Sequence, residues 1–131
     1  MTKTIEEVIT TRLNTHPATS ALLDGRVYIL TAPEHAQEPL VVFRRVSTLY
    51  YPSHDTQSQE LRTQRFQFDI YASGVLETLQ VVEALREALQ GYRDIIDGKQ
   101  VNCIPAGEYH LDDPDRNLKK IAVDYQINYG E

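Results

Sequence analysis

The sequence has 131 residues, of which 41% are hydrophobic and 24% are charged, and its formal net charge is −6. This length predicts one domain over residues 1–131, large enough to bury roughly two thirds of its unfolded surface without disulfide or metal support. The negative charge argues against a protein that works by gripping nucleic-acid phosphates, because such binding depends on Lys and Arg displacing counterions.

Membrane and disulfide signals are missing from the sequence. It has no run of about 18 apolar residues and no charged-then-apolar leader after Met1, so we expect neither export nor membrane insertion. Cys103 is the only cysteine, which excludes an internal disulfide and argues against a zinc site built on thiolates. These features predict synthesis in a reducing, cytoplasmic compartment.

The first predicted element is a helix that begins after Thr4 and ends at Pro17. Thr4 and Glu7 have the spacing of a capping box, in which hydroxyl and carboxylate satisfy free backbone N–H groups. The apolar stripe of this helix consists of Ile5, Val8, Ile9 and Leu13. Residues 18–23 then predict a short helical turn, and residues 26–31 a first strand.

A loop over residues 32–39 leads to a second predicted strand over residues 40–49. Arg44 and Arg45 put one charge on each face of that strand, so one of them needs a partner or lies at a boundary of the core.

Residues 50–60 are polar and exceed the length of a tight hairpin, and we predict a long, exposed loop there. Tyr50 and Tyr51 open this loop. They are either anchors for a partner protein, as paired aromatics often are, or rings that pack back on the sheet.

The clearest pattern is a strand that leads into a helix between residues 61 and 90. One face of the strand is apolar and consists of Phe66, Phe68, Ile70 and Ala72. The other face consists of Arg65, Gln67, Asp69 and Tyr71, which is the alternation of a half-buried strand. After Ser73-Gly74, an apolar stripe at helical spacing predicts a helix that Gly91 ends.

The C-terminal third is predicted to contain a turn region over residues 92–99 and a strand over residues 100–109, broken near Pro105. Residues 111–117 have the composition of a turn, and residues 118–129 alternate as a last strand.

The last strand is expected to pair with residues 65–72, and the helix after Gly74 to pack on their shared apolar face. The chain is thus predicted to be an α+β fold with a mostly antiparallel sheet and helices packed on one face.

No residue pattern in the sequence predicts catalysis. Asp113, Asp115 and Asn117 have the one-three-five spacing of a calcium loop, but Leu118 lies where that loop needs glycine, and an Asx-rich turn explains the run. The histidines lack metal-ligand spacing, and there is no glycine-rich phosphate loop or nucleophile motif. Cys103 has apolar neighbours, which is typical of a buried, inert thiol. We predict no catalytic, metal or cofactor-binding residue and no cofactor.

A cluster of arginines leaves two readings open. Adjacent strands could gather these side chains on one sheet surface, where carboxylates of the same chain or of a neighbouring chain would meet them. The residues concerned are Arg44, Arg45, Arg62 and Arg65.

An ordered set of short motifs covers most of the chain. It comprises the first helix, Tyr28, Ala32-Pro33, Pro39 to Phe43, the Arg-x-Gln-x-Asp-x-Tyr-Ala strand at residues 65–72, a helix with Leu79, Val82, Arg86 and Ala88-Leu89, and a last strand. In this order and spacing the chain resembles the tail-completion, or tail-terminator, family of long-tailed phages and prophages. It differs at Leu40, where the family often has an aromatic residue, and at Ser47-Thr48, which lacks a glycine common after that strand.

The resemblance implies a structural virion protein rather than an enzyme. Such a protein is made in the cytoplasm of the bacterial host and located in the virion tail. It assembles as a ring, as a hexamer, on the head-proximal end of the tail tube, where it ends tube growth and joins the tail to the head connector. Its partners would be copies of itself, the tail tube protein and the head connector protein. DNA would only pass through the lumen, and no membrane is involved.

A ring needs a heterologous interface, and we predict that exposed strand faces and the long loop supply it. The predicted subunit or tube interface consists of Arg44, Arg45, Tyr50, Tyr51, Arg65, Asp69 and Tyr71. Two other functions stay open. One is another neck or minor tail component, such as a head-closure protein; the other is a small ligand-binding or enzymatic bacterial domain, which would need a pocket with converging polar groups.

Overall fold

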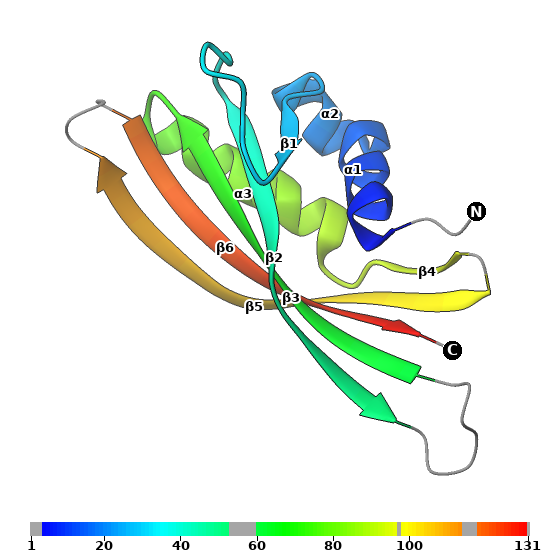
Figure 1. Cartoon of the computed structure of the whole chain (residues 1–131). Helices are drawn as coiled ribbons and strands as arrows, with labels where there is room; N and C mark the ends of the chain where they lie inside the picture. Colours follow the sequence, from blue (N-terminus) through cyan, green and yellow to red (C-terminus); the bar gives the residue numbers. More distant parts are fainter. Residues whose placement is uncertain (1–3, 53–59, 97, 114–117, 131) are drawn as a thin grey trace.

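A computed structural model describes residues 4–52, 60–96, 98–113 and 118–130. In this part of the chain, three helices lie on one face of a curved six-stranded sheet (Figure 1). The helices are α1 (Ile5–Thr15), α2 (Pro17–Leu23) and α3 (Val75–Leu89). The strands are β1 (Val27–Ile29), β2 (Leu40–Pro52), β3 (Glu60–Ala72), β4 (Arg93–Ile96), β5 (Lys99–Asp113) and β6 (Leu118–Gly130).

The strand order is β1-β2-β3-β6-β5-β4, and every neighbouring pair is antiparallel except β1 with β2, which is parallel. The prediction of an α+β fold with a mostly antiparallel sheet and helices on one face is confirmed. The predicted pairing of residues 65–72 with the last strand is confirmed too, since β3 pairs with β6 from Leu61 to Ala72.

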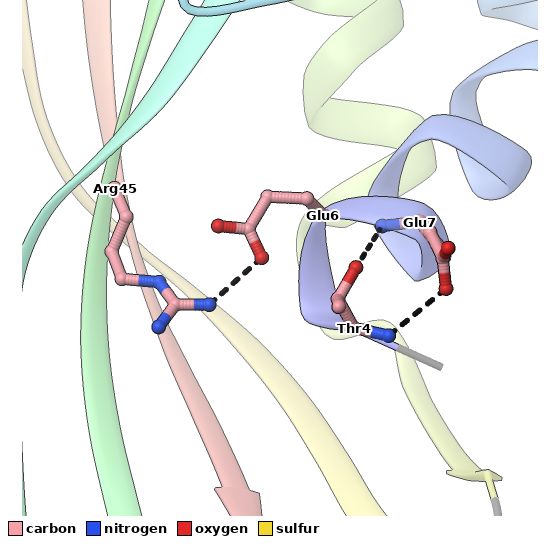
Figure 2. A network of polar contacts seen from close by, with 4 residues as sticks. All are labelled: Thr4, Glu6, Glu7 and Arg45. Atoms are coloured by element: carbon pink, nitrogen blue, oxygen red, sulfur yellow. Dashed lines mark hydrogen bonds and ion pairs between the residues drawn. The ribbon is translucent and has the colours of Figure 1, made fainter. Parts of the chain in front are cut away.

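Helix α1 begins at the predicted capping box. The Glu7 backbone N–H donates to Thr4 Oγ1 at 3.2 Å, and the Thr4 backbone N–H donates to Glu7 Oε2 at 3.0 Å (Figure 2). In the same turn, Glu6 forms an ion pair with Arg45 of β2, with 2.8 Å between Oε1 and Nη2 (Figure 2). The cap therefore fixes where the helix starts, and the ion pair ties that start to the sheet.

The other end of α1 is tied to α3. Arg12 donates from Nε to the carbonyl oxygen of Ala88 at 2.8 Å, so it satisfies one of the last carbonyl groups of α3. The same guanidinium lies 4.4 Å from the centroid of the Tyr92 ring. One arginine thus connects both helices to the segment that enters β4.

The core lies between the helices and the sheet, where the alternation of β3 predicted it. Phe66, Phe68, Ile70 and Ala72 are all 0% exposed. An aromatic cluster occupies the centre: the Phe68 ring lies 5.3 Å from Phe43 and 5.5 Å from Tyr125, between ring centroids. α3 covers this cluster with buried residues at helical spacing, namely Thr78, Val81, Val82, Ala84, Leu85, Ala88 and Leu89.

The predicted loop over residues 50–60 is wrong at both ends. Tyr50 and Tyr51 belong to β2, where they pair with Arg62 and Leu61 of β3. The β2–β3 ladder extends to Pro52 because tyrosine favours strands and because each added residue has a pairing partner in β3. The polar composition of residues 50–60 does not indicate this pairing. Residues 53–59 lie outside the described residues.

The C-terminal third is more regular than predicted. Residues 93–96 were expected to be a turn, but they form β4, which pairs with the start of β5. Ile95 and Ile96 precede an Asp-Gly pair, the sequence of a hairpin, and Gly98 has a φ of +76°. The expected break in β5 is a register shift between Pro105 and Gly107, so the strand bends and continues to Asp113.

Two smaller boundaries also differ. The first strand is shorter than predicted, because Leu30 has a φ of +70°, which an extended strand does not allow. Of the predicted turn over residues 111–117, the first three residues lie in β5, and residues 114–117 lie outside the described part of the chain.

Candidate assembly interface

The face of the sheet that the helices leave uncovered is the main candidate for contacts with other chains. We call it the open face, and the opposite one the covered face (Figure 1). Strand alternation places Arg65, Gln67, Asp69 and Tyr71 of β3 on the open face, because Phe66, Phe68 and Ile70 point into the core. Three of the predicted interface residues therefore share one face.

Polar contacts within the chain connect the strands of the open face. Between β3 and β6, Arg65 Nη2 lies 3.2 Å from Asp124 Oδ2 and Thr63 Oγ1 donates to Asn128 Oδ1 at 3.0 Å; within β3, Gln67 Nε2 donates to Asp69 Oδ1 at 2.8 Å. Both carboxylates are nearly buried, at 7% exposure for Asp124 and 6% for Asp69. The first of the two readings for the arginines, a carboxylate of the same chain, thus applies to Arg65.

Arg44 and Arg45 lie on opposite faces, as their alternation predicted. The Arg45 guanidinium is on the covered face, where it pairs with Glu6 and lies 5.6 Å from the centroid of the Phe66 ring. Arg44 stands opposite Gln67 in the β2–β3 ladder and is exposed. The structure therefore separates two of the arginines that the sequence suggested could gather.

The remaining predicted interface residues are placed by the backbone. Tyr50 and Tyr51 lie in the last part of β2, and their side chains are outside the described set. Tyr71 stands opposite Leu40 of β2 and Lys120 of β6 and is half-buried.

Exposed apolar side chains on and beside the open face were missed by the sequence analysis. Leu49 of β2 is 55% exposed, and Ile104 and Tyr109 of β5 are 42% and 51% exposed. Leu49 borders a shallow hollow of about 260 Å³ that Ser47, Thr63, Arg65, Ala106 and Gln126 also line. For Leu49 and Tyr109 the strand register was the missing signal, since each lies beyond a bulge that shifts the alternation.

Gly107 leaves room for the outer end of the Tyr109 side chain. A Cβ added at Gly107 would come within 3.2 Å of the Tyr109 hydroxyl oxygen, so the tyrosine side chain folds back across the glycine. Gly107 stands opposite Asp124 in the β5–β6 ladder. The bulge and the glycine together position an exposed aromatic beside a nearly buried carboxylate.

A second apolar surface lies on the helical side of the molecule. A groove of about 460 Å³ runs between α2 and α3 and is lined by Ala18, Leu22, Leu76, Leu79, Gln80, Glu83, Ala84 and Glu87. Leu76 is 76% exposed, which is a high exposure for a leucine side chain in a folded protein. Two chemically different surfaces therefore lie on opposite sides of the subunit.

Titratable groups in the core are held in their neutral forms. Burial raises the pKa of Cys103 to about 12 and that of Tyr125 to about 12. At neutral pH the Cys103 thiol is therefore protonated and unreactive, as its apolar neighbours predicted.

Metal-ligand clusters and membrane-spanning helices are not found in the part of the chain that the structure describes. Among the described residues, no three His, Cys, Asp or Glu side chains gather as a metal site would need. Of the calcium-like run, Asp115 and Asn117 lie outside those residues. No described helix is long and apolar enough to cross a bilayer.

Comparison with known proteins gives the family. Residues 7–130 match the family described as "Tail completion protein gp17". Among solved structures, a chain of "Virion of native gene transfer agent (GTA) particle" is similar, with a TM-score of 0.72 and 12% sequence identity over 94% of this chain and 92% of that chain. At this identity the likeness shows a shared fold. No curated protein matches the chain. Because the family match covers all the described strands and nearly all of α1, the chain belongs to the tail completion protein gp17 family and is a structural component of a phage-like virion.

Proposed function

We propose that this protein closes as a homohexameric ring on the head-proximal end of a phage tail tube, ends tube polymerisation there, and joins the tail to the head connector. The observation that carries the proposal is the family match over residues 7–130. The role depends on shape and on complementary surfaces, and it assigns the chain no catalytic step and no cofactor.

Ring formation requires that one patch of a subunit meet a different patch on the next. The proposal is supported by the presence of several distinct surfaces on one subunit: the open face, the apolar groove between α2 and α3, and two edges of the sheet. A ring that also meets a tube below and a connector above needs four such surfaces on each subunit, two for its neighbours and one each for the tube and the connector.

The charge of the chain suits a lumen through which DNA passes. With a net charge of −6, six copies present no overall attraction for phosphates, so translocating DNA is not held by counterion release. In this proposal DNA is a passenger, and the binding partners are the tube protein, the connector protein and further copies of the chain.

Tail length tests the terminator role. Particles made without this protein are expected to carry overlong tubes without heads in electron micrographs, and supplying the chain in trans is expected to restore uniform tails. Tubes of normal length that merely fail to attach heads would contradict tube capping and would point to another neck component.

The oligomeric state tests the ring itself. Light scattering over a concentration series is expected to approach six times the 15.0 kDa mass of the chain, either for the isolated protein or for protein released from tails. A stable dimer under both conditions would contradict the hexameric ring.

A further inference from the structure

Two edges of the sheet are only half covered. β1 pairs with β2 over Val41–Phe43 alone, and β4 pairs with β5 from Lys99 to Asn102. Backbone hydrogen bonds from Gly91 and Tyr92 extend the cover of β5 by one residue, to Cys103. Beyond these points, within the described chain, β2 and β5 each have a strand neighbour on one side only.

Each uncovered edge contains a regular stretch of strand. The bulge of β2 lies between Arg45 and Ser47, and that of β5 between Pro105 and Gly107. After the bulges, Ser47–Pro52 and Glu108–Asp113 continue as ordinary ladder, and each is six residues long. Open backbone donors and acceptors on such a stretch are a template for another strand, and native proteins usually cover it.

The directions of the strands make the two edges compatible with each other. β2, β3, β6 and β5 alternate in direction, so β5 runs opposite to β2. Rotation about a ring axis preserves the direction of each strand from copy to copy. The β5 edge of one copy would therefore meet the β2 edge of the next in antiparallel orientation, and the sheet would continue without a change of pattern.

The positions of the two stretches set a stagger between copies. Pro52 stands opposite Glu60 at one end of the sheet, whereas Asp112 stands opposite Lys119, which pairs with Ala72, at the other end. Neighbouring copies must therefore be displaced along the strands, which tilts the strands relative to the ring axis as a closed barrel requires. β1 and β4 lie beyond the contact at either end and limit how far the copies can slide.

The chemistry of the edges is complementary rather than alike. Residues 44–52 contain two arginines and no carboxylate, whereas residues 104–113 contain Glu108, Asp112 and Asp113 and no Lys or Arg. Each edge also carries an exposed apolar side chain on the open face, Leu49 on β2 and Tyr109 on β5. Two β5 edges paired over Glu108–Asp113 would put Glu108 opposite Asp113, whereas Ser47–Pro52 has no charged residue, so the fitting occupant of the β5 edge is the β2 edge of a second copy.

We infer that subunits of the ring join edge to edge, with Ser47–Pro52 of one copy pairing antiparallel to Glu108–Asp113 of the next. This inference rests on the proposed ring and names the contact that closes it. A continuous sheet then runs around the ring, with the open face on one side and the helices on the other.

Disulfide trapping in assembled rings tests the pairing. In a Cys103→Ala background, Leu49→Cys is combined with a single cysteine at position 108, 109, 110 or 111. Strand alternation predicts disulfide-linked multimers on non-reducing gels for position 109 or 111 and none for positions 108 and 110, because only alternate residues share a face with Leu49. Leu49→Cys alone is expected to give no linked species, since the interface is heterologous.

The outcomes separate this inference from the proposed function. Rings of sixfold mass that link at none of the four positions, or at all four alike, overturn edge pairing and leave the terminator role intact. Linking of Leu49→Cys alone would mean that like edges meet and would also overturn it. Failure to form any ring, alone or on tails, together with tubes of normal length in the absence of the protein, would overturn both.

Discussion

The two faces of one sheet differ in what fills them. On the covered face, Phe43, Phe66 and Phe68 are 0% exposed and their rings contact one another. On the open face, ion pairs and hydrogen bonds such as Arg65 to Asp124 hold adjacent strands together. β3 contributes alternate residues to each face. Adjacent residues of this strand are therefore held by different interactions, apolar packing on the covered face and polar contacts on the open face. The covered face stabilises the fold, and in the proposed ring the open face and its edges are available for assembly.

The largest expected effect comes from the covered face. Phe68→Ala removes a ring that packs between Phe43 and Tyr125, and it should lower the free energy of unfolding by about 3–5 kcal/mol. Gln67→Ala, one residue away on the open face, should lower the free energy of unfolding by only about 1 kcal/mol, since it loses one partly buried hydrogen bond to Asp69. Urea unfolding monitored by circular dichroism measures both. Equal losses at the two positions would mean that the faces are not energetically distinct.

The sequence was sufficient where the pattern is local. Phe66 to Ala72 alternate over a whole strand, and Thr4 with Glu7 form a cap within one turn, so both were predicted correctly. β4 carried a local signal too, in Ile95, Ile96 and the Asp-Gly pair, but a turn was assigned to the whole region.

Contacts between distant segments could not be predicted from the sequence. Nothing near Arg45 indicates that Glu6, thirty-nine positions earlier, is its partner. Likewise, Asp69 and Asp124 lie on a polar strand face and were expected to be exposed, yet the neighbouring strands and long side chains of the curved sheet nearly bury them. The sequence placed Arg65, Asp69 and Tyr71 on one face correctly, but exposed Leu49 and Tyr109 required the register beyond each bulge.

The next effect in size tests whether the open face also contributes to stability. Arg65→Ala leaves the Asp124 carboxylate, whose side chain is 10% exposed, without its cation. The expected loss is about 1–3 kcal/mol, towards the lower end because the Arg65 side chain is 47% exposed and partly screened by water. Asp124→Asn in the same background should recover part of the loss, since no buried charge is left.

Arg44→Ala is the matched control for Arg65→Ala. It removes an exposed arginine from the adjacent strand of the same face and should change stability by about 0.5 kcal/mol or less. If Arg44→Ala and Arg65→Ala lower the free energy of unfolding by the same amount, the ion pair between Arg65 and Asp124 does not stabilise the fold measurably.

Alkaline pH should act through the covered face. Burial raises the pKa of Cys103 from 9.0 to about 12, so the folded state holds this proton more tightly than the unfolded state. The resulting stability is fully present below about pH 9 and is lost as pH rises towards 12, at no more than about 1.4 kcal/mol per pH unit. Tyr125 adds a similar loss as pH rises from about 10, the pKa of its unfolded side chain, towards 12.

Cys103→Ala isolates the thiol contribution. The variant should show a flatter stability profile between about pH 9 and 10, measured as the urea midpoint, because the unfolded thiol ionises in this range while the folded thiol keeps its proton. An unchanged slope would mean that the thiol is already ionised or solvated in the folded protein.

The smallest effect on stability should accompany a visible effect on assembly. Arg44 is exposed and lies at the point where β1 stops covering β2, so Arg44→Glu should change the free energy of unfolding by about 0.5 kcal/mol or less. The same change removes the positive charge excess of the β2 edge, which faces the acidic β5 edge of the next copy in the inferred ring. Rings of this variant should dissociate at higher protein concentration than the wild type at low salt, and the difference should shrink as salt screens the edges. Arg93→Glu on β4 alters net charge equally but lies outside both uncovered edges, residues 44–52 and 104–113, so it should leave ring dissociation unchanged. If both variants weaken the ring alike, overall charge governs assembly, and the distinction between the sheet's edges and the rest of its surface fails.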